Sequence, residues 1–119
     1  MVREVGAGTS LTDLVRSVRD DGRQVLVVPA GATVGQSLDW FAESLRLPDW
    51  FGRNLDALAD CLHDLAEEEP ADDTEGLVLV WDRVAVLKAV DPDGYDGIRS
   101  VLGEVEDEHP SLGVVVVDR

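Results

Sequence analysis

The amino-acid sequence predicts an α/β domain in which a parallel sheet is flanked by helices. The first observation is three short apolar runs, each with the length of a strand, at residues 24–28, 76–81 and 113–117. These runs do not alternate apolar with polar residues, which is typical of strands covered on both faces. The second observation is helical periodicity between the runs, which supplies helices to cover the sheet.

Length and composition indicate a single domain without a prosthetic group. A chain of 119 residues with 45% apolar residues can bury one core, and it contains no run of about 18 apolar residues that could span a membrane. Cys61 is the single cysteine and lies outside any Cys/His spacing typical of zinc sites. We therefore expect no disulfide, no metal and no cofactor. The first residues lack the pattern of a secretory signal, so a cytoplasmic location is expected.

Two helices are predicted between the first and second apolar runs. Residues 33–46 show three- and four-residue apolar spacing, with Thr33 available as the N-cap and Pro48 closing the segment. Residues 54–66 form the second helix, with Asn54 as the N-cap. Its apolar stripe consists of leucines, and its other face is acidic. The stripe comprises Leu55, Leu58, Leu62 and Leu65.

The second half of the chain predicts a short helix, a loop and a last helix. Asp82 can cap a helix that runs through residue 89, and residues 91–94 have the composition of a loop. The last helix ends before Pro110. Residues 11–19 also show helical spacing, and they form either an accessory helix or a loosely held arm.

The charge of the chain favours a basic partner. The formal net charge is −15, which counts against direct binding of nucleic acid or of an anionic membrane. Between Asn54 and Asp82 the sequence has no lysine or arginine, although acidic residues are frequent there. Residues 67–75 are best explained as a solvated acidic loop. The earlier aspartates lie on the second helix and need a separate interpretation.

Asp56 and Asp60 are four residues apart, so both carboxylates lie on the same face of the predicted helix, opposite the leucine stripe. Asp56 also lies in the first turn, where the helix dipole favours a negative charge. Charge and spacing alone therefore indicate a preorganised acidic surface for a basic partner.

Residues 47–62 resemble the central motif of the barstar family, intracellular inhibitors of secreted bacterial ribonucleases. The segment combines Leu-Pro, an aromatic pair, Gly and Asn with Leu-Asp-Ala-Leu and Asp-Cys-Leu in unbroken register. Weaker similarity continues through residues 77–81, residues 100–102 and the closing valine strand. The resemblance implies a three-stranded parallel sheet packed by helices. It covers residues 24–119, the expected inhibitor domain, and leaves residues 1–23 as an N-terminal extension, for which a helix is one of the two alternatives.

The resemblance also implies which residues meet the partner. Asp60 is expected to reach the phosphate site of the ribonuclease, and Asp56 is expected to contact a basic group at its rim. The two carboxylates would then mimic RNA phosphates. A further acidic contact comes from the last helix, where Asp107 is the best-aligned candidate and Glu108 the next. Ala59 stands where the best-known member of the family has tryptophan, so the choice of ribonuclease stays open. The full predicted surface comprises Trp50, Asn54, Asp56, Ala59, Asp60, His63, Asp64 and Asp107.

The predicted function is inhibition of a basic microbial ribonuclease, barnase-like or otherwise guanyl-preferring, by a bacterial protein that is monomeric when free. The alternative is an immunity or regulatory module of the same fold that neutralises another basic toxin. An enzyme is disfavoured, because His63 and Asp60 are neighbours on a helix without an accompanying nucleophile. A calcium loop after Asp91 is also disfavoured, because Tyr95 and Asp96 occupy the positions that need an oxygen ligand and glycine.

Overall fold

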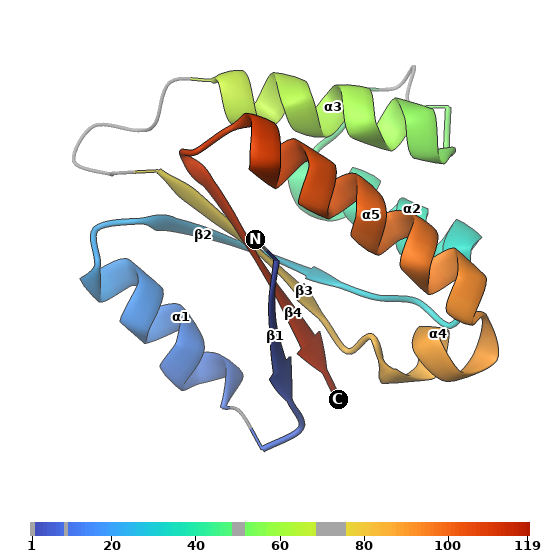
Figure 1. The fold of residues 1–119 in the computed structure, drawn as a ribbon, viewed down its shortest axis with the longest axis horizontal. Helices are drawn as coiled ribbons and strands as arrows, with labels where there is room; N and C mark the ends of the chain where they lie inside the picture. Colours follow the sequence, from blue (N-terminus) through green and yellow to red (C-terminus); the bar gives the residue numbers. More distant parts are fainter. Residues whose placement is uncertain (1, 9, 49–51, 69–75) are drawn as a thin grey trace.

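The computed structural model describes residues 2–8, 10–48, 52–68 and 76–119 (Figure 1). Strands and helices alternate along most of the chain, with two helices after β2 and two more after β3. In chain order the elements are β1 (Arg3–Gly6), α1 (Leu11–Asp20), β2 (Gln24–Pro29), α2 (Val34–Leu45), α3 (Leu55–Glu67), β3 (Leu77–Asp82), α4 (Ala85–Val90), α5 (Pro92–Glu108) and β4 (Leu112–Asp118).

The sheet is parallel, as predicted, but it has four strands rather than the predicted three. Its strand order is β1-β4-β3-β2, and every neighbouring pair is parallel. The additional strand is β1, which pairs with β4 so that Arg3 lies opposite Val115 and Gly6 opposite Asp118. β1 is short, polar and mostly exposed. An edge strand of this kind needs no apolar run, and the sequence pattern therefore does not predict it.

Helices cover both faces of the sheet, but unequally. α2, α3, α4 and α5 lie on one face, and α1 lies on the other (Figure 1). The larger core lies under the four helices and includes Phe41, Leu58, Trp81 and Ile98. The smaller core lies under α1. It consists of Leu14, Val78, Val80, Val115 and Val117.

The predicted boundaries around α2 and α3 are confirmed to within a residue. The Thr33 hydroxyl accepts a hydrogen bond of 3.1 Å from the backbone N–H of Gln36, which caps α2. Asn54 caps α3 in the same way. The three apolar runs form β2, β3 and β4, each shifted or extended by about one residue, a normal uncertainty for such boundaries.

Two predictions in the second half of the chain are wrong. Asp82 does not cap α4. It is the last residue of β3, and its buried carboxylate accepts two hydrogen bonds of 2.8 Å from the Arg119 guanidinium. Residues 91–94 do not form a loop, because α5 begins at Pro92 and the Asp91 carboxylate caps it by accepting from Gly94 N–H at 3.0 Å. Proline at the first helical position is compatible with a helix, which explains the longer α5.

The two possibilities for residues 11–19 are resolved in favour of a helix. α1 begins after Ser10, whose hydroxyl accepts a hydrogen bond of 3.3 Å from Asp13 N–H. Its buried residue Leu14 belongs to the smaller core, so this helix is packed against the sheet. Within the described parts of the chain, no helix combines the length and apolar character needed to cross a membrane. The division of the chain at residue 23 stays a prediction.

Candidate functional site: the acidic face of α3

Capping and burial together fix the orientation of α3. The Asn54 side-chain oxygen accepts a hydrogen bond of 2.8 Å from Ala57 N–H, and its amide group donates to the Gly52 carbonyl at 3.3 Å. Both ends of the Asn54 amide are thus used locally. Leu58 and Leu62 are completely or almost completely buried in the larger core. The opposite side of α3 therefore points outward.

This outward side carries a row of three carboxylates. Asp56, Asp60 and Asp64 follow one another at four-residue intervals, and all three are exposed. Residues at this spacing are neighbours on a helix surface, so the row runs along α3 for two turns. Asp56 lies in the first turn, where the helix dipole favours its charge. We call these three residues the acidic row.

α5 lies beside α3 and is held there by several contacts (Figure 1). Near the beginning of α3 the two helices approach closely, because Gly97 has no side chain and a Cβ atom there would lie 3.0 Å from Leu55 Cδ1. At the other end, buried Glu106 accepts a hydrogen bond of 2.6 Å from Val114 N–H at the beginning of β4. The last turn of α5 is thereby fixed to the sheet.

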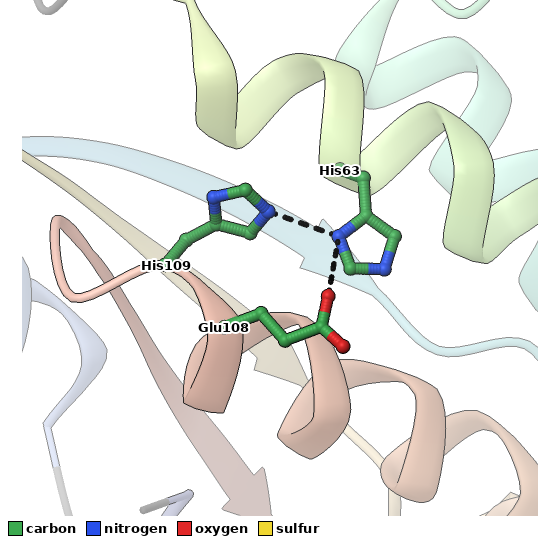
Figure 2. A group of neighbouring side chains, drawn as sticks. All are labelled: His63, Glu108 and His109. Carbon is green, nitrogen blue, oxygen red and sulfur yellow. Dashed lines mark hydrogen bonds and ion pairs between the residues drawn. The ribbon is translucent and has the colours of Figure 1, made fainter.

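A polar junction connects the two helices at this end. Figure 2 shows His63 of α3 facing Glu108 and His109 at the end of α5. His63 Nδ1 lies 2.9 Å from His109 Nε2 and 3.5 Å from a Glu108 carboxylate oxygen. The two imidazole rings are tilted, with 5.1 Å between their centres. We call His63, Glu108 and His109 the histidine junction.

Sequence patterns do not predict the histidine junction. In the sequence, His63 is a predicted partner contact and Glu108 is the second candidate for the acidic contact on the last helix, and no pattern singles out His109. A signal is nevertheless available, because the chain has only two histidines and both lie at predicted helix positions or ends. Their contact depends on the packing of α3 against α5, which residue spacing alone does not give.

The electrostatic environment of the acidic row is negative. Arg53 is the basic residue next to α3 in sequence, and its guanidinium is paired with Asp39 of α2 at 2.7 and 2.9 Å. Burial raises the pKa of the Cys61 thiol, and the carboxylates of Asp64 and Asp60 raise it further. The same carboxylates that disfavour a thiolate attract a cationic partner.

The structure places most of the predicted surface on one helix face. Asp56, Ala59, Asp60, His63 and Asp64 share the outward side of α3, with Ala59 and His63 half-buried and the aspartates exposed. Asn54 is exposed at the beginning of this helix.

The two remaining predicted contacts lie off α3. Asp107 is exposed in the last turn of α5, whereas Glu108 is the residue that reaches α3 through His63. Trp50 falls outside the described residues. The arrangement offers carboxylates for binding a cationic surface.

Comparison with known proteins assigns a family to this region. Residues 30–117 match the family described as barstar (barnase inhibitor). The match extends from the end of β2 almost to the end of β4, and it includes α3 and α5. Among curated proteins no match is found.

Proposed function

The chain belongs to the barstar family, whose members are inhibitors of ribonucleases, and we propose that it inhibits a basic secreted ribonuclease by covering its active site with α3. The acidic row, exposed on a rigid helix inside the matched region, is the observation that carries this proposal. Ribonucleases bind phosphate oxygens with cationic side chains, and the carboxylates of the row are suited to replace those oxygens. On this proposal the chain is a binding protein without catalytic activity.

Asp60 is the proposed anchor of the complex. It lies in the middle of the acidic row, with Asp56 one turn before it and Asp64 one turn after it. The buried leucines on the opposite side of α3 hold the helix in place, so little conformational freedom is lost when the partner binds. Asp56 would then contact the rim of the active site. Asp107 on α5 would add a further acidic contact.

A ribonuclease assay with two charge-matched variants tests the anchor. The chain is titrated against small secreted microbial ribonucleases, and Asp60→Asn is compared with Asp20→Asn. Asp20 is exposed on α1, on the opposite side of the sheet, and both substitutions remove one negative charge (Figure 1). Removing one partner of a buried interfacial charge pair typically costs about 2–5 kcal/mol or more, a range drawn in part from the barnase–barstar complex itself.

We expect Asp60→Asn to weaken inhibition by at least about thirtyfold, corresponding to the low end of that range, and Asp20→Asn to change it little. Equal losses in the two variants would mean that only net charge matters and that Asp60 is no anchor. The inhibition constant should also rise with salt concentration, because screening slows the encounter of opposite charges. If micromolar protein at low salt inhibits none of the ribonucleases, the proposal fails.

Ala59 offers a second test at the same surface. This residue is half-buried between Asp56 and Asp60 on the outward side of α3, so a larger side chain there would extend toward the partner. We expect Ala59→Trp to tighten binding to a barnase-like ribonuclease by adding apolar contact area. Unchanged or weaker binding would contradict the idea that a small residue limits affinity for that class of enzyme.

The second candidate function is neutralisation of another basic toxin by the same surface. It is favoured by the departures from the family pattern at Ala59 and by the extra charge of Asp64. Pull-down with toxin domains that carry a cationic active site would support it if ribonucleases fail. On either proposal the chain acts in the bacterial cytoplasm and is monomeric until it meets its target.

A further inference from the structure

The carboxylates proposed to contact the ribonuclease, those of Asp56, Asp60 and Asp107, lie outside the histidine junction, and we propose that this junction is a binding site for one divalent transition-metal ion of the zinc class. His63 Nδ1, His109 Nε2 and a Glu108 carboxylate oxygen would be the three protein ligands. The proposal does not depend on the identity of the protein partner, because it concerns only side chains of this chain.

The distances between the ligand atoms fit a common ion. All three atoms lie within 4.8 Å of one another, and His63 Nδ1 is 2.9 Å from His109 Nε2 and 3.5 Å from Glu108. Ligands bound to zinc at about 2.0–2.2 Å lie about 3.3–3.6 Å apart in a tetrahedral site. The His63–Glu108 distance already lies in this range, and the two imidazoles need to separate by only a few tenths of an ångström. The Glu108 and His109 ligand atoms lie within 4.8 Å of each other, and rotation of the exposed Glu108 side chain can bring them closer.

The donor set selects the class of metal. Two imidazole nitrogens and one carboxylate oxygen suit zinc and the neighbouring late transition metals, whereas calcium and magnesium prefer oxygen ligands alone. Three protein ligands leave a fourth position for water or for a donor atom of another molecule. Glu108 is exposed, with 60% of its side chain accessible, whereas His63 is accessible to only 27%. Figure 2 shows the ligand atoms of the three residues converging from two helices.

The ligands are attached to backbone that is fixed in position. His63 lies within α3, between buried Leu62 and exposed Asp64. His109 is the C-cap of α5: its N–H donates to the Val105 and Glu106 carbonyls, and its own carbonyl accepts from Leu112 N–H at 2.9 Å. Little backbone motion is then needed for binding, and the ion would connect α3 to the end of α5.

Metal titration of the full chain tests the site directly. The protein is stripped with a chelator, and zinc is then added near neutral pH in a calorimeter. Cobalt is added in parallel because its visible absorption reports the coordination geometry. We expect one ion per chain and a tetrahedral cobalt spectrum. His63→Ala and His109→Ala should each weaken binding by about tenfold or more.

Matched variants separate this site from general attraction to an acidic protein. Glu108→Gln and Glu104→Gln each remove one charge from the same helix, one turn apart, and only the first should weaken zinc binding. Cys61→Ala should bind zinc as the unmodified chain does, since Cys61 is buried.

The variants also define the results that would overturn the site. The proposal is overturned if the histidine variants bind as tightly as the unmodified chain, if the two glutamate variants behave alike, or if Cys61→Ala loses the ion. Circular dichroism of each variant establishes that it is folded before its affinity is compared. None of these measurements uses a ribonuclease, so their failure would leave the proposed inhibition unaffected.

Discussion

The two faces of the sheet differ in how they are covered and in what they present to solvent. Four helices cover one face, and α3 and α5 expose carboxylates above a core that contains Phe41 and Trp81. α1 alone covers the other face within the described residues, over a core made largely of valines from β3 and β4. The thickly covered face can hold a rigid binding surface, because its helices are fixed from beneath. The thinly covered face is buried by one short segment, α1, and its core depends on that segment for burial.

Deleting residues 2–21 is expected to destabilise the thinly covered face more than any other change. The deletion removes β1 and α1 and exposes a face on which Val78, Val80, Val115 and Val117 are now buried. Burial of one valine is worth about 1.5–3 kcal/mol, so four approach the total stability of a typical domain, about 5–15 kcal/mol. We expect the truncated chain to lose cooperative urea unfolding and to bind a hydrophobic dye.

The same deletion tests the predicted division of the chain. Residues 24–119 are proposed as the inhibitor domain, and we expect them to need residues 2–21 as a cover. A truncated chain with an unchanged urea midpoint would contradict this expectation and show that residues 24–119 suffice. Inhibition of a ribonuclease by the truncated chain at low temperature would further locate the binding function in the second part.

Two leucine substitutions measure how tightly each of the two cores is packed. Leu58 of α3 is fully buried in the larger core, whereas Leu14 of α1 is 8% exposed in the smaller core. Leu→Ala in a core costs about 2–5 kcal/mol, and the cost is highest where the surroundings cannot relax. We expect Leu58→Ala near the upper end and Leu14→Ala near the lower end, measured by urea unfolding. Equal losses would mean that both faces are packed equally tightly.

On the face with four helices, α2 and α3 are the elements that the sequence predicts best. α2 and α3 carry regular apolar stripes with good N-caps, Thr33 and Asn54, and these local signals agree with their tertiary packing. β1 carries no such signal, since its pairing depends on β4 more than a hundred residues away. Asp82 has the residue type of a helix cap, but its carboxylate instead accepts a hydrogen bond from Arg119, which is distant in sequence.

In the candidate site, too, features that depend on neighbouring residues can be predicted from the sequence, and features that depend on contacts between distant residues cannot. The acidic row can be predicted because its residues share one helix and their spacing fixes their common face. The histidine junction cannot, because His63 and His109 are separated by 46 positions and meet only through the packing of α3 on α5. The different positions of Asp107 and Glu108 cannot be predicted from the sequence for a similar reason. It is the packing of α5 against α3 that brings Glu108, and not Asp107, to His63.

Glu4 connects the N-terminal segment to the face with four helices. Its carboxylate accepts hydrogen bonds of 3.1 Å from the Tyr95 hydroxyl and 2.8 Å from the Arg99 guanidinium, both on α5. Because Glu4 is exposed, we expect Glu4→Ala to lower the free energy of unfolding by only about 0.5–1.5 kcal/mol. Glu43→Ala, at an exposed position of α2, is the control in the same urea assay. A loss no larger than that of the control would mean that this connection contributes nothing.

Titration of Tyr95 tests the contact between Glu4 and Tyr95 through the pKa of the tyrosine, and the expected change is small. Burial, followed by the hydrogen bond from its hydroxyl to Glu4, raises the pKa of Tyr95 to about 12. Tyr95 is the single tyrosine of the chain, so its ultraviolet titration is unambiguous. Glu4→Gln keeps an acceptor oxygen but removes the charge. We expect the pKa to fall while staying above about 10, its ordinary value, because the ring remains buried.

The sign of the effect on stability follows from the direction of this shift. The folded chain holds the Tyr95 proton more tightly than the unfolded chain, so the contribution is fully present below pH about 10 and is lost as the pH rises toward about 12. Glu4→Gln should therefore reduce the loss of stability in this range. If the pKa is the same with and without Glu4, burial alone sets it, and the N-terminal segment contacts α5 without influencing it.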